Sequence, residues 1–330
     1  MTGGLPEVDP YEHDLARWGT SLAHTAELSL PCLDAVGARS VVEVGAYAGD
    51  FTRVLVAWAA RSGARVAAVD PAPQPDLVAL ERAHPELELI RATSHAALRE
   101  IPLPDAVVID GDHNFHTVRE ELRLIGERAP GAELPLLLFH DVCWPHGRRD
   151  DYFDPQAIPP EARNEPLVGT EAGLHPGDPG VRPHGVPYPR SAAREGGPAN
   201  GVLTAIEDFV AERERVRLVV VPAFFGLGAA WHLDAPWSDA VAAILDPWDR
   251  NPVLERLEAN RVHHIAQAYA AALELERHRA GQEAVLRRML ESSAFGVAER
   301  LSRLRVRLGI APAQSVISKD EVRRVLGEGR

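Results

Sequence analysis

Short apolar runs separated by helix-length polar stretches constrain the fold of this chain most strongly. The first five runs lie at 40–44, 66–69, 87–91, 106–109 and 135–140. Runs of this length without polar alternation are typical of strands that are buried on both faces of a parallel sheet. Because helix-length segments separate the strands, we expect an α/β, doubly wound, Rossmann-like sheet.

Two further runs, at 217–221 and 227–233, follow after a long interruption. Only 222–226 joins them, which is too short for a crossover helix, so they should form an antiparallel hairpin at one edge of the sheet. The complete sheet would then be seven-stranded and mostly parallel. The interruption, 143–200, is dense in Pro, Gly, Arg and His and lacks a sustained period. A long irregular loop inside a compact domain is usually functional or disordered, and we interpret this one as an active-site lid.

Helical spacing appears before and after the sheet segment. Apolar positions over 11–36 predict an N-terminal helical cover, which we place at 1–37. From 249 to 330 the apolar positions again follow helical spacing, including Leu254, Leu257, Val262, Ile265 and Leu275. We therefore expect an α/β domain at 38–248, which carries the insertion 143–200, and a helical C-terminal appendage at 249–330. A tail of this length makes a homo-oligomer, in the simplest case a dimer, a reasonable expectation.

Charge and cysteine content exclude several classes of protein. The formal net charge of −13 argues against a nucleic-acid partner, because phosphate backbones require clustered Lys and Arg. Two cysteines, Cys32 and Cys143, make neither a disulfide framework nor a thiolate metal site. The N-terminus has no apolar signal core, and the most apolar stretch, 218–231, is too short to span a bilayer. We expect a cytoplasmic protein without membrane insertion.

The segment 41–49 carries the clearest ligand signal. A β-branched strand containing Glu43 runs into a turn with glycines at 45 and 49, and a helix is expected over 51–60. Asp70 ends the second run, 21 residues after Gly49 (70 − 49), where a carboxylate is placed to accept hydrogen bonds from a ribose diol. Tyr47 occupies the position of the second glycine in a dinucleotide fingerprint, where its side chain would crowd a pyrophosphate. The alternative is a tight strand-to-helix turn that binds no ligand.

This pattern resembles motif I of class I methyltransferases, E/D-x-G-x-x-x-G, with Asp70 at the acidic position after the second strand. A carboxylate at Glu43 also suits a cationic sulfonium ligand better than a diphosphate. The resemblance implies that S-adenosylmethionine is the cofactor. The expected cofactor-binding residues are Glu43, Gly45, Tyr47, Gly49, Asp70, Ser94 and Asp110.

Two polar clusters follow later strands, at 110–116 and 140–142. In open α/β sheets ligands bind outside the carboxyl ends of the strands, so both clusters should lie beside the glycine turn. An aliphatic hydroxyl must lose its proton to accept a methyl group, which requires a general base or a Lewis-acidic metal. In one interpretation Asp110, His140 and Asp141 hold a divalent ion.

In the other interpretation, His113 or His140 acts as the base and a carboxylate such as Asp112 or Asp141 holds its tautomer. The catalytic candidates are therefore His113, His140 and Asp110. For Asp112, Asn114 and His116, capping of strand ends and helix N-termini is an equal alternative.

The stretch I-D-G-D-H-x-x-x-x-V-x-x-E-L at 109–122, followed by F-H-D-V at 139–142, resembles the group of macrocin-type sugar O-methyltransferases and cephalosporin hydroxylase-like proteins. Macrocin-type enzymes depend on magnesium and use acidic residues after the fourth and fifth strands. Asp110 and Asp141 match these positions, whereas His140 stands where a second aspartate would be. A histidine ligand is less typical of magnesium and leaves manganese, iron or zinc open.

The resemblance implies O-methylation of a hydroxyl on a small-molecule or glycan acceptor, such as a sugar or a sugar-bearing natural product. The lid would then carry acceptor specificity through side chains that can bind a polyol. These are Arg148, Arg149, Tyr152, His175, His184 and Tyr188. Two alternatives stay open: a metal-dependent hydroxylase or hydrolase on the same fold, and a non-catalytic partner protein that keeps a cofactor fold.

Overall fold

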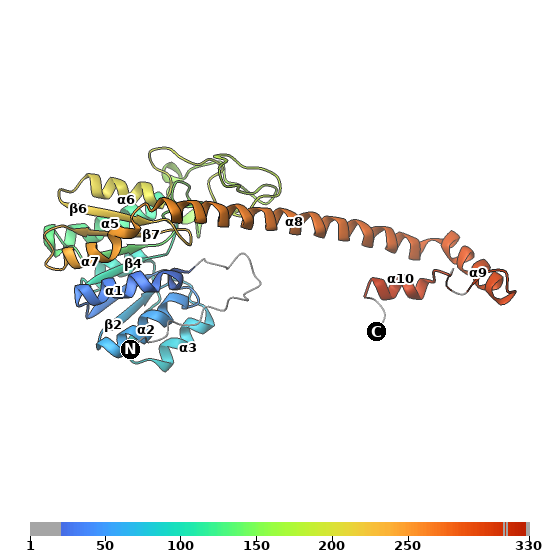
Figure 1. Ribbon diagram of the computed structural model, residues 1–330, viewed down its shortest axis with the longest axis horizontal. Coiled ribbons are helices and arrows are strands. Elements are labelled where there is room, and N and C mark those ends of the chain that lie inside the picture. The colour runs from blue at the N-terminus through green and yellow to red at the C-terminus, as the bar shows by residue number, and fades with distance from the viewer. Residues whose placement is uncertain (1–20, 313, 315, 328–330) are drawn as a thin grey trace. The chain divides into compact units, whose positions relative to one another are not determined.

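The computed structural model describes residues 21–312, 314 and 316–327, and within them seven strands form one mixed sheet (Figure 1). Its order is β3-β2-β1-β4-β5-β7-β6. The strands are β1 (Ser40–Val44), β2 (Arg65–Val69), β3 (Leu87–Ile90), β4 (Ala106–Ile109), β5 (Leu136–Phe139), β6 (Val216–Val221) and β7 (Leu227–His232). The first five are parallel, and β7 pairs antiparallel with both β5 and β6. The predicted doubly wound sheet and its antiparallel edge hairpin are confirmed.

Helices cover both faces of the sheet, and the strand residues alternate between two apolar clusters. Val108 and Leu138 pack in a cluster with residues of α1 (Ala26–Val36), α2 (Asp50–Ser62), α3 (Pro75–Ala83) and α7 (Ser238–Leu245). Val107 and Leu137 face the opposite cluster, which includes residues of α4 (Ser94–Glu100), α5 (Phe115–Arg128) and α6 (Val202–Ala211). Because both faces are buried, each central strand is a continuous apolar run.

The segment 143–200 has an irregular backbone, as its composition predicts. It contains two 3-10 turns, at Pro155–Ala157 and Pro160–Ala162, and isolated bridges such as Asp151 to Ser191. Side chains nevertheless pack inside it: Arg149, Asp150 and Tyr152 are fully buried. The segment is therefore a folded insertion with an interior of its own.

The chain divides into two compact units, 1–268 and 269–330. The sequence suggested an appendage that starts at 249, but the first turns of α8 (Pro252–Glu291) belong to the larger unit and bury Glu258, Val262 and Ile265. Leu257 and Leu275, which the sequence grouped with Val262 and Ile265 by helical spacing, are 59% and 70% exposed. The buried positions recur every three or four residues from Glu258, and Leu257 falls outside that stripe.

The remaining terminal elements are α9 (Ser293–Arg307) and α10 (Lys319–Val325) in the second unit, and a 3-10 turn (Leu22–Thr25) that precedes α1. Of the predicted N-terminal cover, residues 22–36 are helical, and residues 1–20 lie outside the described residues. In the described part of the chain, every helix is too short or too polar to cross a membrane.

Candidate active site

A cavity of about 700 Å³ lies where β1, β2 and β4 end. Strands β1 and β4 pair in register up to Val44 and Ile109, so the residues that follow them emerge at the same edge of the sheet. Six of the seven predicted cofactor-binding residues line this cavity, and Gly49 does not. The six are Glu43, Gly45, Tyr47, Asp70, Ser94 and Asp110.

The two glycines of the turn are needed for packing within the protein. Gly45 has φ +86°, and a Cβ there would lie 2.1 Å from the backbone oxygen of Asp110. Gly49 also has φ +86°, and its Cβ would approach the Leu77 side chain on α3 to 3.3 Å. Both positions therefore require glycine for left-handed backbone or close approach. Gly49 packs against α3 and lies outside the cavity lining, so its predicted contact with a cofactor stays a prediction.

Asp70 shapes the rim of the cavity after β2. Its Oδ2 accepts a hydrogen bond from the Tyr47 backbone N–H (2.7 Å), and its Oδ1 accepts one from the Ala72 N–H (2.7 Å). Each carboxylate oxygen has a further lone pair for a ligand hydroxyl. Tyr47 itself has φ +43° and a side chain that is 58% exposed, so the turn presents Tyr47 outward and its N–H inward.

Glu43 is a buried acid beneath the same turn. Its Oε2 accepts a hydrogen bond from Thr52 Oγ1 on α2 at 2.6 Å. Burial raises the pKa of Glu43 to about 8, the Thr52 hydrogen bond opposes this rise, and the nearby Asp110 carboxylate adds to it. A cationic ligand in the cavity would favour the ionised form.

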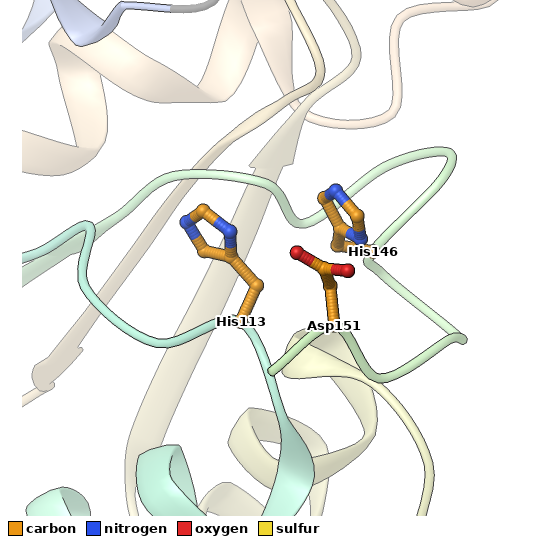
Figure 2. A group of neighbouring side chains, drawn as sticks. All are labelled: His113, His146 and Asp151. Carbon is orange, nitrogen blue, oxygen red and sulfur yellow. The ribbon is translucent and has the colours of Figure 1, made fainter. Parts of the chain in front are cut away.

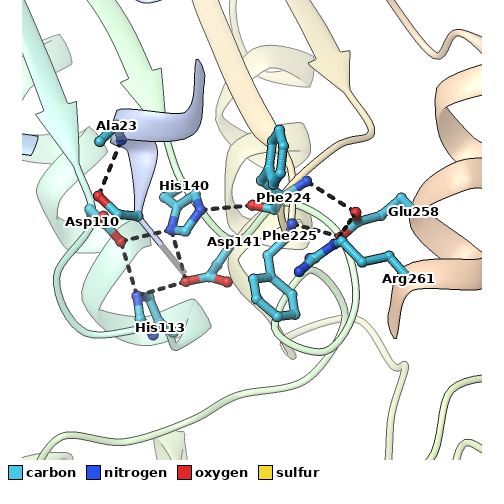
Figure 3. Close-up of polar contacts among 10 residues, drawn as sticks. Ala23, Asp110, His113, His140, Asp141, Phe224, Phe225, Glu258 and Arg261 are labelled. Atoms are coloured by element: carbon cyan, nitrogen blue, oxygen red, sulfur yellow. Dashed lines mark hydrogen bonds and ion pairs between the residues drawn. The ribbon is translucent and has the colours of Figure 1, made fainter. Parts of the chain in front are cut away.

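Two carboxylates and two imidazoles form a ring at the ends of β4 and β5 (Figure 3). Asp110 Oδ1 lies 3.2 Å from His140 Nδ1 and 3.4 Å from His113 Nε2. Asp141 Oδ2 lies 3.3 Å from His140 Nδ1 and 3.1 Å from His113 Nε2. The structure thus brings together all the residues that the sequence predicts for the metal and for catalysis. We call these four residues the Asp-His ring.

The members of the Asp-His ring offset one another's charge. Burial lowers the pKa of His113, but Asp141 and Asp110 outweigh burial and raise it to about 9. Burial opposes the charge of His140 as well, and the same carboxylates raise its pKa well above the ordinary value. Burial works to raise the pKa of Asp141, and the two imidazoles hold it far below its usual range.

His140 and His113 differ in access. His140 is 1% exposed, and its Nε2 lies 2.9 Å from the Phe224 carbonyl oxygen, which can only accept a hydrogen bond. Nε2 therefore carries a proton, and Nδ1 faces the two carboxylates. His113 has a side chain that is 26% exposed and lines the cavity. Of the two histidines, His113 is the one that a substrate in the cavity can reach.

The donor set of Asp110, His140 and Asp141 fits a divalent cation. Their ligand atoms lie within 4.8 Å of one another. Metal–ligand bonds of about 2.1 Å at right angles place adjacent ligand atoms about 3.0 Å apart, close to the 3.2 Å and 3.3 Å separations around His140 Nδ1. The Phe224 carbonyl accepts the other ring N–H, as the outer partners of metal-binding histidines usually do.

His146 and Asp151 in the insertion lie near His113, and sequence reasoning did not assign them a role. Ligand atoms of His113, His146 and Asp151 lie within 4.8 Å of one another, and the Asp151 carboxylate points toward the space between the two imidazoles (Figure 2). The His113 and His146 rings stack, with centroids 5.2 Å apart. His146 and Asp151 begin and end the stretch H-G-R-R-D-D, which follows shortly after F-H-D-V. This closeness in sequence to the predicted site is the signal that could have identified them.

Four residues that the sequence brought into consideration for the site have structural roles, and for Asn114 and Asp112 such a role was the stated alternative. The Asn114 side chain caps α5 by accepting the Thr117 N–H at 2.8 Å, and Asp112 accepts the Phe153 N–H at 2.8 Å. Arg149 and Tyr152, predicted to bind the acceptor, are fully buried inside the insertion. Arg149 donates to the Ala192 carbonyl, and the Tyr152 hydroxyl donates to Asp150.

Solved structures similar to this one include methyltransferases. A SAH-bound methyltransferase of Podospora anserina is 15% identical, with a TM-score of 0.42 over 66% of this chain and 81% of that chain. A putative caffeoyl-CoA O-methyltransferase from Staphylococcus aureus is 9% identical, with a TM-score of 0.37 over 63% of this chain and 82% of that chain. Human N-acetylserotonin methyltransferase, in complex with SAM, is 11% identical, with a TM-score of 0.37 over 66% of this chain and 54% of that chain.

No curated protein compared with the chain matches it. Residues 42–142 match the family model described as a methyltransferase domain. The chain is similar to this family over the matched residues, which make up less than half of its length. The matched segment begins in β1, contains the glycine turn, and ends just after Asp141, so it includes the cavity-lining residues that follow β1, β2 and β4 and the whole Asp-His ring.

Proposed function

We propose that this protein transfers the methyl group of S-adenosylmethionine to a hydroxyl of a sugar, glycan or sugar-bearing natural product. The observation that carries the proposal is the position of Asp110, which lines the cavity and is also a member of the Asp-His ring. A methyl donor in the cavity would therefore lie next to groups that can take up a proton. The sugar acceptor rests on the resemblance to macrocin-type enzymes.

Asp110, His140 and Asp141 would hold a divalent cation, as the donor set indicates. When bound, the cation would act as a Lewis acid that lowers the pKa of an acceptor hydroxyl. His140 would bind through Nδ1, because its Nε2 proton is held by the Phe224 carbonyl. A cation held by Asp110 and Asp141 would offset the carboxylate charges that raise the pKa of His113, and this favours the neutral imidazole that a base requires.

The chemical step is an in-line displacement. The acceptor oxygen forms a bond to the methyl carbon while the carbon–sulfur bond breaks, and the electron pair of that bond stays on sulfur. His113 Nε2 takes the proton of the hydroxyl. Glu43 and Asp70 hold the donor on the other side of the cavity, so the chain contributes mainly orientation and proton removal.

Binding of the methyl donor is the first test. We expect isothermal titration to show that wild-type protein binds S-adenosylmethionine and S-adenosylhomocysteine. Asp70→Asn should weaken both by about tenfold or more, because a hydrogen bond to a charged group contributes about 1.5–3 kcal/mol. Asp76→Asn, an equal change at an exposed site on α3, should bind as wild type. Absence of binding by the wild type would end the proposal.

Turnover tests the acceptor class and the cation. Methyl transfer to a panel of glycosides should depend on added divalent ion and disappear on chelation. Asp110→Asn should lower kcat at least a hundredfold, whereas Asp239→Asn at an exposed site on α7 should not. Conversion of the acceptor without a methyl donor would favour the hydroxylase or hydrolase alternative. Binding of S-adenosylmethionine without turnover of any acceptor would favour the non-catalytic alternative.

A further inference from the structure

The turn between β6 and β7 connects the Asp-His ring to helix α8. Phe224 and Phe225 in this turn have φ +54° and +65°, a left-handed conformation that bulky residues seldom adopt. Two consecutive residues of this kind persist only where the surrounding structure holds them. The contacts that hold them come from two directions, the end of β5 and the first turns of α8.

On the β5 side, the carbonyl groups of the turn accept hydrogen bonds. The Phe224 carbonyl lies 2.9 Å from His140 Nε2, and the Phe225 carbonyl accepts the Cys143 N–H at 2.7 Å. His140 and Cys143 flank Asp141 in sequence. The turn therefore fixes the His140 imidazole before Asp141 and the Cys143 backbone after it.

On the α8 side, one carboxylate accepts both N–H groups of the turn. Glu258 Oε1 accepts from Phe225 N at 2.8 Å, and Oε2 accepts from Phe224 N at 3.1 Å. Glu258 is 8% exposed, and Arg261 pairs with it through two contacts of 2.6 Å and 2.7 Å. The Arg261 guanidinium also lies 4.3 Å from the centroid of the Phe225 ring. Bidentate pairing of this kind fixes orientation as well as charge.

These contacts form one continuous series from α8 to the Asp-His ring (Figure 3). Arg261 holds Glu258, Glu258 holds the N–H groups of the turn, and the Phe224 carbonyl holds the imidazole of His140. His140 Nδ1 then faces Asp110 and Asp141. A rotation of the Phe224 peptide would remove the acceptor of the Nε2 proton and free the imidazole to turn.

We infer that Glu258 is a positioning residue of the active site, which sets the orientation of His140 through the Phe224 peptide. The inference deepens the proposed function, because His140 is a proposed cation ligand. It goes further by making the first turns of α8 part of the site, outside the matched segment 42–142. Outer partners of metal-binding histidines typically change affinity by 10- to 100-fold when they are removed.

The experiment uses full-length protein and Mn²⁺ as the probe. Glu258→Gln keeps the size of the side chain but places an amide N–H₂ toward one backbone N–H, and Glu258→Ala removes both acceptors. Glu255→Gln, an exposed position one turn earlier on α8, is the matched control. We expect both Glu258 variants to bind Mn²⁺ at least tenfold more weakly than wild type, while S-adenosylmethionine affinity stays within twofold.

A second readout does not depend on the cation. In cation-free protein labelled with ¹⁵N-histidine, the Nε2 proton of His140 should give a slowly exchanging resonance, assigned by its loss in His140→Asn. That resonance should disappear or exchange rapidly in Glu258→Gln and Glu258→Ala, and remain in Glu255→Gln. If wild type binds no Mn²⁺, the cation part of the proposed function fails and the resonance alone decides the inference. Unchanged resonance in both Glu258 variants would overturn it.

Discussion

Several side chains in this site are ionisable groups that the fold removes from water. Glu43 is the clearest case, because its carboxyl group is buried and keeps only the Thr52 hydroxyl as a hydrogen-bonding partner among the described contacts. Burial raises the pKa of Glu43 to about 8, well above its unfolded value near 4.5. The folded protein therefore holds a proton there that the unfolded chain releases. Between pH 4.5 and 8 this carboxyl group makes the free energy of unfolding fall as pH rises.

The raised pKa of Glu43 predicts proton release on binding of a cationic donor. The sulfonium charge favours the carboxylate, so the affinity for S-adenosylmethionine should rise by up to about tenfold between pH 6.5 and 8.5. Glu43→Gln keeps an acceptor for Thr52 but cannot ionise, and it should flatten this part of the pH dependence. Titrations in buffers of different ionisation enthalpy measure the protons released. Identical pH profiles for wild type and Glu43→Gln would contradict the assignment.

The sequence predicted the Asp-His ring because its members directly follow buried strands, and parallel strands end at one edge. Glu258 could not be predicted in this way. It lies in a long helix with many charged residues, where a glutamate is usually solvated, and only the tertiary contact with the turn at 224–225 shows its role. The packing of Gly49 against Leu77 could not be predicted either, since a glycine in a turn does not reveal which neighbour requires it.

The sequence predicted the ends of secondary-structure elements to within a residue or two where the element is completely buried. The strand expected at 106–109 is β4 at Ala106–Ile109, because a run buried on both faces has sharp ends. The insertion 143–200 is different. Without a period, its sequence does not distinguish side chains that face a substrate from those that face its own interior, as Arg149 and Tyr152 show.

Asp150 organises the insertion and joins it to the elements around the site. Its Oδ1 accepts the N–H groups of Phe115 and Gly201 at 2.7 Å each, at the starts of α5 and α6. Its Oδ2 accepts the Tyr152 hydroxyl at 2.8 Å and the Asn164 amide at 2.6 Å. The carboxylate is fully buried, and four donors would lose their acceptor if it were removed.

Asp150→Ala should therefore lower the free energy of unfolding by about 3 kcal/mol or more, because each buried donor left unpaired costs about 1–3 kcal/mol. Urea denaturation measures this, and limited proteolysis should show new cleavage within 143–200. Glu171→Ala, at an exposed position of the same insertion, is the control and should change stability by less than about 0.5 kcal/mol. Resistance of Asp150→Ala to proteolysis would argue against an organising role.

For the whole molecule, the decisive question is where the catalytic unit ends. The sequence suggests a boundary at 249, after the last strand and helix of the α/β sheet. Contacts place it after Ala268 instead, so the first four turns of α8 complete the unit that contains the site. The reason lies in Val262, Ile265 and Ala266, whose burial against that unit cannot be inferred from a helical pattern alone.

Two truncated chains test whether the catalytic unit ends at 249 or after Ala268. A chain ending at 268 should unfold in urea at the same midpoint as the full-length protein and bind S-adenosylmethionine equally well, because it keeps every buried residue of α8.

A chain ending at 249 loses Glu258, Val262 and Ile265. Burial of each large aliphatic side chain contributes about 1.5–3 kcal/mol, so this chain should lose about 4 kcal/mol or more. The turn at 224–225 would also lose its carboxylate acceptor, so Mn²⁺ binding should weaken more than stability alone requires. Equal stability and equal Mn²⁺ affinity of the two truncated chains would return the boundary to 249 and leave α8 without a part in the site.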